Sequence, residues 1–193
     1  NAPGGQQVDF CAGLEVPFIN NSFNSASYHW DFGVPNIAND TSNLFEPVYT
    51  YTTPGIYTVT LVTNPGWECA DTASIVYTAI ETFTPNITLA ATHCINNAMA
   101  YDFISGLDIS TLPTLTQFNW SFPNGSNPLN SSLAEPQNIV LPELLMTYDI
   151  GLSIDNQGCI GSQTITINND PPTVANVPPQ SVFCAGNTYQ FEN

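Results

Sequence analysis

The chain of 193 residues contains no lysine or arginine, and its 16 acidic residues give it a formal net charge of −16 at pH 7. Basic residues normally make up roughly a tenth of a globular protein. Without them the chain cannot neutralise a nucleic-acid backbone, bind a phosphate through a guanidinium or form a Schiff base, and an anionic membrane would repel it.

The same deficit removes every cleavage site for a trypsin-like protease. We interpret it as an adaptation to exposure to such proteases, although drift within a repeat family that tolerates any solvated polar residue would have the same result. No apolar run reaches the ~20 residues of a membrane span, and no signal peptide is visible at the start. We therefore expect a soluble segment.

Hydrophobic residues make up 42% of the chain and aromatic residues 11%, which is too apolar for a disordered acidic tail. Thr, Val, Ile, Tyr and Phe dominate, and 16 prolines and 12 glycines interrupt them. This composition is typical of short strands joined by turns, so the sequence predicts an all-β fold.

Residues 1–82 are predicted to form a first unit. Within it, apolar alternation indicates strands around 16–18, 28–32, 56–61 and 73–79. In the third of these, Tyr57, Val59 and Leu61 share one face. A Pro54-Gly55 turn precedes that strand, and a linker follows the last one.

Residues 83–171 repeat this organisation. Trp30 of the first unit recurs as Trp120, and Cys69 recurs as Cys159, both at an offset of 90 residues. An internal repeat of this length, made of short alternating strands, is typical of a β-sandwich. We therefore expect tandem β-sandwich repeats.

A third copy begins near the end of the sequence. The segment FCAGNTYQFEN from Phe183 matches FCAGLEVPFIN from Phe10, so residues 172–193 are predicted to hold a linker and the first strand of a truncated repeat. The linker from Asn168 is rich in proline and therefore semi-stiff. Linkers of this kind suit an extended rod of domains.

One stretch of the first unit carries a specific family resemblance. Tyr-His-Trp-Asp-Phe-Gly from Tyr28, then Pro47 and Tyr51, then Pro-Gly-Ile-Tyr-Thr-Val-Thr-Leu from Pro54 resemble the PKD (polycystic kidney disease) domain. The resemblance implies an immunoglobulin-like β-sandwich. The second unit departs from it, with Ser121 in place of the Asp and no Pro-Gly turn.

The added cysteines make the repeats similar to those of giant surface adhesins of gliding Bacteroidota, exported by the type IX secretion route. This resemblance implies an extracellular, cell-surface location, a role in adhesion and gliding motility, and no catalysis. Asp71-Thr72-Ala73 also looks like the O-glycosylation signal of that bacterial group, which would place a sugar on Thr72.

Five cysteines in such an array indicate disulfides. The simplest pairing lies within each unit, Cys11 with Cys69 and Cys94 with Cys159, and leaves Cys184 for a partner outside the segment. In an immunoglobulin-like topology, however, the two cysteines of a unit fall at opposite poles, too far apart for one bond. Pairing between neighbouring units is the alternative, and it would join the array covalently into a rod.

Candidate chemistry is sparse. The serines lack a nucleophile elbow and the two histidines are isolated, so we expect no enzyme, no cofactor and no metal site. The alternative is calcium held by turn carboxylates, a weak pattern because no complete binding loop is present. Its candidate residues are Asp40, Asp71, Asp102, Asp108 and Asp155. Trp67 in a turn is the candidate glycan contact.

The first functional hypothesis is therefore a structural and adhesive segment of a long extracellular repeat protein. Its expected partners are neighbouring repeats, surface polysaccharide, or further copies in a filament, and neither nucleic acid nor direct insertion into a membrane. The alternative is a carbohydrate-binding or spacer module of a secreted multidomain enzyme, or a spacer stiffened by calcium.

Overall fold

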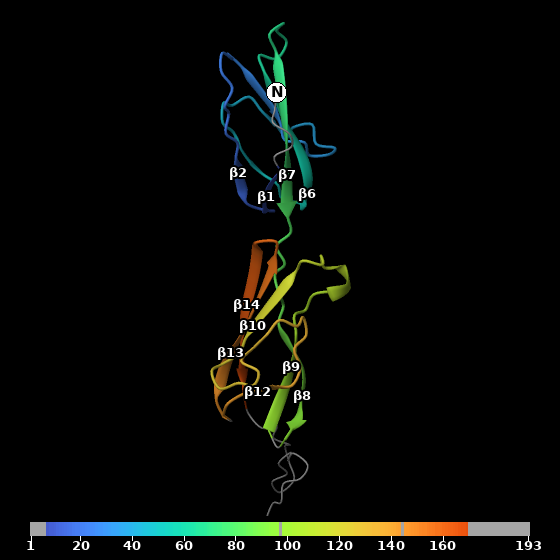
Figure 1. The fold of residues 1–193 in the computed structure, drawn as a ribbon, viewed down its shortest axis with the longest axis vertical. Helices are drawn as coiled ribbons and strands as arrows, with labels where there is room; N and C mark the ends of the chain where they lie inside the picture. The colour runs from blue at the N-terminus through green and yellow to red at the C-terminus, as the bar shows by residue number, and fades with distance from the viewer. Residues whose placement is uncertain (1–6, 97, 144, 170–193) are drawn as a thin grey trace, which may run out of the picture. The chain divides into compact units, whose positions relative to one another are not determined.

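Strands dominate the computed structural model, which describes residues 7–96, 98–143 and 145–169 (Figure 1). In these residues the α-helix is absent, and the helical content is one 3-10 turn, η1 (Ile109–Thr111). The chain divides into two compact units, Asn1–Thr82 and Phe83–Asn193. The predicted third repeat and Cys184 lie outside the described residues.

The first unit is a sandwich of two sheets. The larger sheet has the order β1 (Gln7–Cys11), β7 (Asp71–Ile80), β6 (Gly55–Thr63), β3 (Tyr28–Asp31) and β4 (Thr41–Ser42). The smaller pairs β2 (Glu15–Pro17) with β5 (Val48–Thr50). The pair of β1 with β7 is parallel, and the other pairs are antiparallel.

The core of the first unit follows the predicted alternation. Tyr57, Val59 and Leu61 of β6 are buried, whereas Thr58 between them is exposed. Their inward faces meet a cluster of aromatic rings, in which Phe18 lies 5.6 Å from Trp30 between ring centroids. Burial of these large side chains supplies most of the driving force for folding.

The Asp-Phe-Gly turn after β3 has a structural role. The Asp31 carboxylate accepts a hydrogen bond from the Gly33 N–H at 2.8 Å. Gly33 has a φ of +73°, and a side chain there would collide with the backbone carbonyl of Thr58. The Tyr51 hydroxyl donates to the Phe32 carbonyl at 2.9 Å and so ties the turn to the opposite sheet. Glycine is therefore the only residue that fits at position 33 of this turn.

The second unit is also built from two sheets. One sheet has the order β11 (Asn130–Ser131), β10 (Gln117–Ser121), β13 (Thr147–Asn156) and β14 (Cys159–Asn168). The other has the order β12 (Ile139–Val140), β9 (Ala98–Ile104) and β8 (Thr88–Ile95). The most deeply buried core residues come from both sheets and include Phe103, Trp120, Ile139, Ile150, Leu152 and Ile154. The fold is thus an all-β, immunoglobulin-like sandwich, as predicted.

The leading strands of the two units differ, which the sequence did not reveal. β1 joins the larger sheet of its unit beside β7, whereas β8 pairs antiparallel with β9. The tight turn between β8 and β9 explains this antiparallel pairing. Ile95 and Ala98 pair across the turn, and Asn96 adopts a φ of +49°, as a two-residue hairpin requires. β1 instead ends in a turn at Gly13, whose N–H donates to the Tyr51 carbonyl.

Candidate functional site

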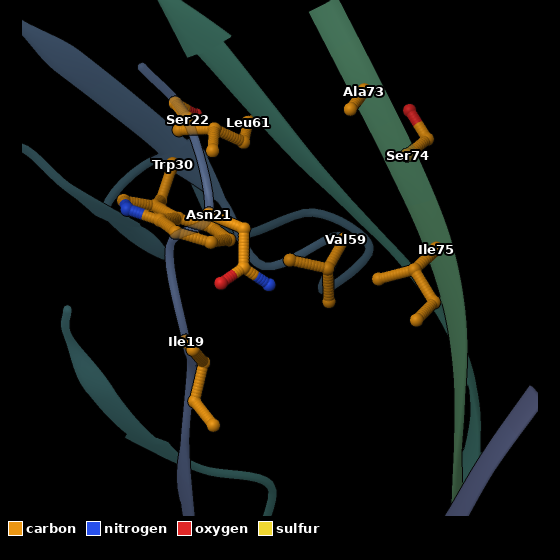
Figure 2. A pocket seen from close by; sticks show the side chains of 9 residues that line it. All are labelled: Ile19, Asn21, Ser22, Trp30, Val59, Leu61, Ala73, Ser74 and Ile75. Atoms are coloured by element: carbon orange, nitrogen blue, oxygen red, sulfur yellow. The ribbon is translucent and has the colours of Figure 1, made fainter. Parts of the chain in front are cut away.

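The first unit contains an apolar hollow of about 320 Å³. Its floor is the inward face of β3, β6 and β7, and the segment after β2 forms the opposite wall. Figure 2 shows Val59 and Ile75 directed toward the segment that carries Ile19 and Asn21. The residues that line it are Ile19, Asn21, Ser22, Trp30, Val59, Leu61, Ala73, Ser74 and Ile75.

The lining of this hollow limits its chemistry. None of the nine lining residues is titratable, and the polar side-chain groups are one amide, two hydroxyls and the indole N–H of Trp30, which donates to the Leu44 carbonyl. The hollow therefore offers apolar surface and a few hydrogen bonds, but no general acid, general base or charged ligand. No sequence pattern predicts this hollow, because it depends on how the two sheets pack.

The corresponding edge of the second unit is covered. Ala73 in the hollow corresponds to Gln163. In the first unit the buried Trp30 pairs with Leu61, which pairs with Ala73. In the second unit the buried Trp120 pairs with Leu152, which pairs with Gln163. Gln163 accepts a hydrogen bond from the Ile87 N–H, and Phe83 and Ile87 pack on the core of that unit. In the second unit, the segment that precedes β8 thus covers the position that borders the hollow in the first unit.

Trp67 lies in the turn between β6 and β7 and is 71% exposed. A second hollow of about 320 Å³ lies at this end of the unit, and it is lined by Ser22, Phe23, Asn24, Ser25, Thr63, Asn64, Cys69 and Asp71. Asn64 holds it in shape, because its side chain accepts the Ala26 N–H at 2.8 Å. Exposed aromatic rings beside amide and hydroxyl groups are the elements of a sugar-binding surface. The glycan contact of Trp67 stays a prediction.

Thr72, the candidate O-glycosylation site, is the second residue of β7. Its side chain is exposed, and its backbone pairs with Val62. The Asp71 carboxylate accepts the Thr72 N–H at 2.9 Å. The hydroxyl is therefore open to a modifying enzyme, and its modification stays a prediction.

The cysteines correct one sequence prediction. Cys69 is an exposed free thiol, whereas Cys11 is disulfide-bonded, so the predicted bond between them is wrong. The reason is the length of β7: Cys11 pairs with Ile80 at the end of this strand, and Cys69 precedes its first residue. Ten residues of strand span about 30 Å, far more than the Cα separation of about 4.4–6.8 Å that a disulfide permits.

Cys94 and Cys159 of the second unit are both disulfide-bonded, but the strand geometry is incompatible with a bond between them. Cys159 begins β14. Tyr101, which pairs with Thr92 of β8, donates its hydroxyl to Asn169 just beyond the other end of β14. Figure 1 shows the β8–β9 turn and the β13–β14 turn at opposite ends of this unit.

The acids proposed for calcium do not come together. Each carboxylate accepts a backbone N–H. The donor is close in sequence for Asp40 (Val34), Asp71 (Thr72), Asp108 (Ser110) and Asp155 (Gly158), whereas Asp102 of β9 accepts from the distant Asn138. In the part of the chain that the structure describes, no three His, Cys, Asp or Glu side chains gather as a metal site would require.

The titratable groups act as structural partners. Two hydrogen bonds from Ser110 lower the pKa of Asp108, which caps η1. Burial raises the pKa of Tyr51, and the neighbouring tyrosines add to the shift. His29 contacts Asn43, whereas His93 contacts Asn138 and lies 3.6 Å from Asp102. The two histidines thus lie in different units with different partners.

Comparison with known proteins identifies the first unit. Residues 3–80 match the model of the PKD domain. PKD and immunoglobulin-like domains are typically extracellular adhesion or spacer modules and are generally non-catalytic. None of the curated proteins compared with the chain matches it. Within the described residues, no helix has the length and apolar character needed to cross a bilayer.

Three solved structures have some likeness to the chain. The amphioxus IgVJ-C2 molecule is 12% identical, with a TM-score of 0.37, and the alignment covers 83% of this chain and 99% of that one. Murine CEACAM1b is 13% identical, with a TM-score of 0.37 and coverage of 84% and 94%. The chicken CNTN1 FN1–FN3 domains are 13% identical, with a TM-score of 0.35 and coverage of 86% and 64%.

Proposed function

We propose that the chain is a structural and adhesive segment of a long extracellular repeat protein and that its units catalyse no reaction. One observation carries the proposal. The register Trp30–Leu61–Ala73 of the first sandwich recurs as Trp120–Leu152–Gln163 in the second. The second unit lies outside the PKD match, yet it builds the same central ladder, which supports two copies of one module in tandem.

The distribution of chemistry supports a role without catalysis. The carboxylates described above accept hydrogen bonds from backbone N–H groups, and the apolar hollow has no titratable lining. A net charge of −16 also disfavours anionic partners. What the surface offers is exposed aromatic and amide groups, which suit neutral polysaccharide or another copy of the chain.

The same proposal puts the parent protein on the surface of a gliding bacterium of the Bacteroidota. The support is the sequence resemblance of the cysteine-containing repeats to adhesins of that group, together with the Asp71-Thr72-Ala73 signal. In this setting the segment is exported, glycosylated at Thr72 and built into a surface filament. Its lack of lysine and arginine protects such a filament from trypsin-like proteases.

Adhesion can be tested on the whole segment. Beads that carry residues 1–193 through an N-terminal tag are passed over polysaccharide-coated glass and over glass coated with the segment itself. We expect retention under flow several-fold above that of beads carrying an unrelated sandwich domain. Retention no greater than that of the control beads on both surfaces would refute the adhesive part of the proposal.

A carbohydrate-binding module is the second candidate, favoured by the hollow next to the β6–β7 turn. Phe23 on its rim is 84% exposed, and Trp67 lies in the same turn as Asn64 and Cys69, which line it. Stacking on a sugar ring would use these aromatic faces. The test is a glycan array with Trp67→Ala and Phe23→Ala, and with Ile160→Ala at the equivalent turn of the second unit as the matched control. Binding that survives both aromatic substitutions rules this site out.

A further inference from the structure

We propose that the apolar hollow of the first unit binds an extended peptide strand of a partner protein. This strand carries large apolar side chains four residues apart and a basic residue ahead of them. The inference goes beyond the proposed adhesive role, because it assigns a protein ligand to one face of the first unit. It is carried by the open edge of β7, by the lining of the hollow and by the occupied equivalent in the second unit.

The first half of β7 has one strand neighbour among the described residues. β6 pairs with β7 from Asp71 to Ala79, whereas β1 pairs on the other edge with Val76–Ile80 alone. The edge of β7 at Asp71–Ile75 is therefore open to a further strand. A strand added there would extend the parallel pairing of β1 with β7, so the proposed interface is continuous with one that the unit already forms.

Apolar side chains lie beside this open edge. Ala73 and Ile75 pair with Leu61 and Val59, and all four line the hollow on the inward side of the sheet. On the opposite wall, Ile19 is 71% exposed (Figure 2). A docked strand that inserts apolar side chains between these walls would remove their surfaces from water, which favours binding.

The second unit shows which kind of segment fits this geometry. Phe83 and Ile87, from the segment before β8, pack on the core of that unit. The Phe83 carbonyl lies against Gly161, and the Ile87 N–H donates to the side chain of Gln163, so the segment runs parallel to β14. Residues four apart in an extended chain share one face. The matching occupant of the first unit is therefore an extended strand with large apolar side chains at this spacing.

The first unit does not provide such side chains from its own leading sequence. Seven residues before the opening cysteine, the second unit has Ile87 before Cys94, and the first unit has Gly4 before Cys11. The sequence of residues 1–6, Asn-Ala-Pro-Gly-Gly-Gln, contains no large apolar residue. The side chains that fill the hollow therefore come from another molecule.

Asp71 determines the charge of the partner. It corresponds to Gly161, because these residues stand two places before Ala73 and Gln163. Its side chain takes the space that Gly161 leaves to the Phe83 carbonyl, so a docked strand lies farther from β7 at this end. A long basic side chain spans such a gap and pairs with the carboxylate. The chain has no lysine or arginine, so the strand belongs to a different protein.

A labelled peptide tests the site on the whole 193-residue segment. The probe has the sequence of residues 81–89 with Glu81→Lys, so it carries Phe83 and Ile87 behind a basic residue. Fluorescence anisotropy is expected to show saturable binding, and binding at least ten-fold weaker for the same peptide with Phe83→Ser and Ile87→Ser. Absence of saturable binding, or equal affinity of the two peptides, would overturn the proposal.

Two variants of the segment locate the bound peptide. Ala73 is exposed at the open edge, and Ala73→Trp is expected to fill the hollow and to weaken binding at least ten-fold. Thr58 is exposed on the other face of the same sheet, so Thr58→Trp is the matched control and should bind as wild type does. Binding that survives Ala73→Trp would put the peptide elsewhere on the segment and overturn the assignment to this hollow.

Asp71→Asn tests the charge. The asparagine keeps an oxygen for the Thr72 N–H but loses the negative charge, so affinity for the Glu81→Lys peptide should fall several-fold at low salt. Affinity for the unaltered peptide should not fall. An unchanged affinity for the Glu81→Lys peptide would overturn the basic character of the partner. A segment that binds the peptide in solution but retains no beads refutes adhesion alone.

Discussion

Trp30 and Trp120 occupy the same position in the two sandwiches. The indole N–H of each donates to the carbonyl of a leucine in the loop that follows, Leu44 at 3.1 Å and Leu133 at 2.9 Å. Each tryptophan is also almost fully buried, at 5% and 1% exposure. The indole thus both fills the core and fixes a loop, which explains why it persists where the Asp-Phe-Gly turn does not.

Replacement of this tryptophan should be severe. We expect Trp120→Ala to lower the free energy of unfolding of the second unit by about 3–5 kcal/mol, because it leaves a cavity in the core, and to leave the Leu133 carbonyl without its donor. Trp67→Ala, which removes an exposed ring, should change the free energy of unfolding of the first unit by less than about 0.5 kcal/mol. Urea unfolding followed by far-UV circular dichroism compares the two, and equal losses would contradict the assigned burial.

Two glycines allow the energetic cost of a left-handed backbone to be compared with the cost of a steric collision. Gly33 and Gly66 both have positive φ, +73° and +84°, but a side chain collides with the Thr58 carbonyl only at Gly33. Gly66→Ala should cost about 1 kcal/mol, the penalty of the left-handed backbone, and Gly33→Ala about 2 kcal/mol more because the strand must also shift. Thermal melts of both variants test the difference. Similar melting temperatures would mean that a side chain at residue 33 does not collide with β6.

Alkaline pH should destabilise the first unit. Burial raises the pKa of Tyr51 above its ordinary value of 10.0. The folded state therefore holds the proton more tightly than the unfolded chain, so this contribution to stability is complete below pH 10 and is lost as the pH rises through the folded pKa. Tyr51→Phe should flatten part of the decline, at a cost of about 1–3 kcal/mol at pH 7 for the unpaired Phe32 carbonyl.

Urea titrations between pH 8 and pH 12 measure that effect. Tyr49 and Tyr77 also have pKa values raised by burial, so the variant should keep a shallow decline. Wild-type stability that stays constant up to pH 12 would show that these hydroxyls ionise as freely in the folded state as in the unfolded chain.

The thiol chemistry of the native segment should be dominated by Cys69. An aromatic disulfide reagent is expected to titrate the exposed Cys69 thiol rapidly in wild type and to lose this fast phase in Cys69→Ser, with no change in the melting temperature because the side chain is exposed. A fast phase that survives Cys69→Ser would mean that the reactive thiol lies elsewhere.

Local patterns of sequence predicted the sheets well, because period-two alternation fixes which face of a strand is buried. Tyr57, Val59 and Leu61 show this directly. The partner of the leading strand could not be predicted in the same way. β1 and β8 carry comparable residues, and the choice of sheet depends on the turn that follows, at Gly13 in one unit and at Asn96 in the other.

The candidate sites were harder to predict. The exposure of Trp67 follows from its turn, and the distance argument against pairing within a unit needed only strand length. Which of the two cysteine alternatives holds, and where a hollow stays open beside Ile75, depends on the way whole segments pack. Ala73 and Gln163 lie at equivalent positions, yet one borders a hollow and the other binds a leading segment.

Single-molecule extension tests the central claim, a tandem array of two like sandwich modules. The segment is pulled from its two ends in the presence of a reductant. The account predicts two separate unfolding events, each of which releases about 80 residues and so lengthens the chain by roughly 27 nm at ~3.4 Å per residue. A single event that releases both lengths at once, or a gradual extension without any event, would contradict the account.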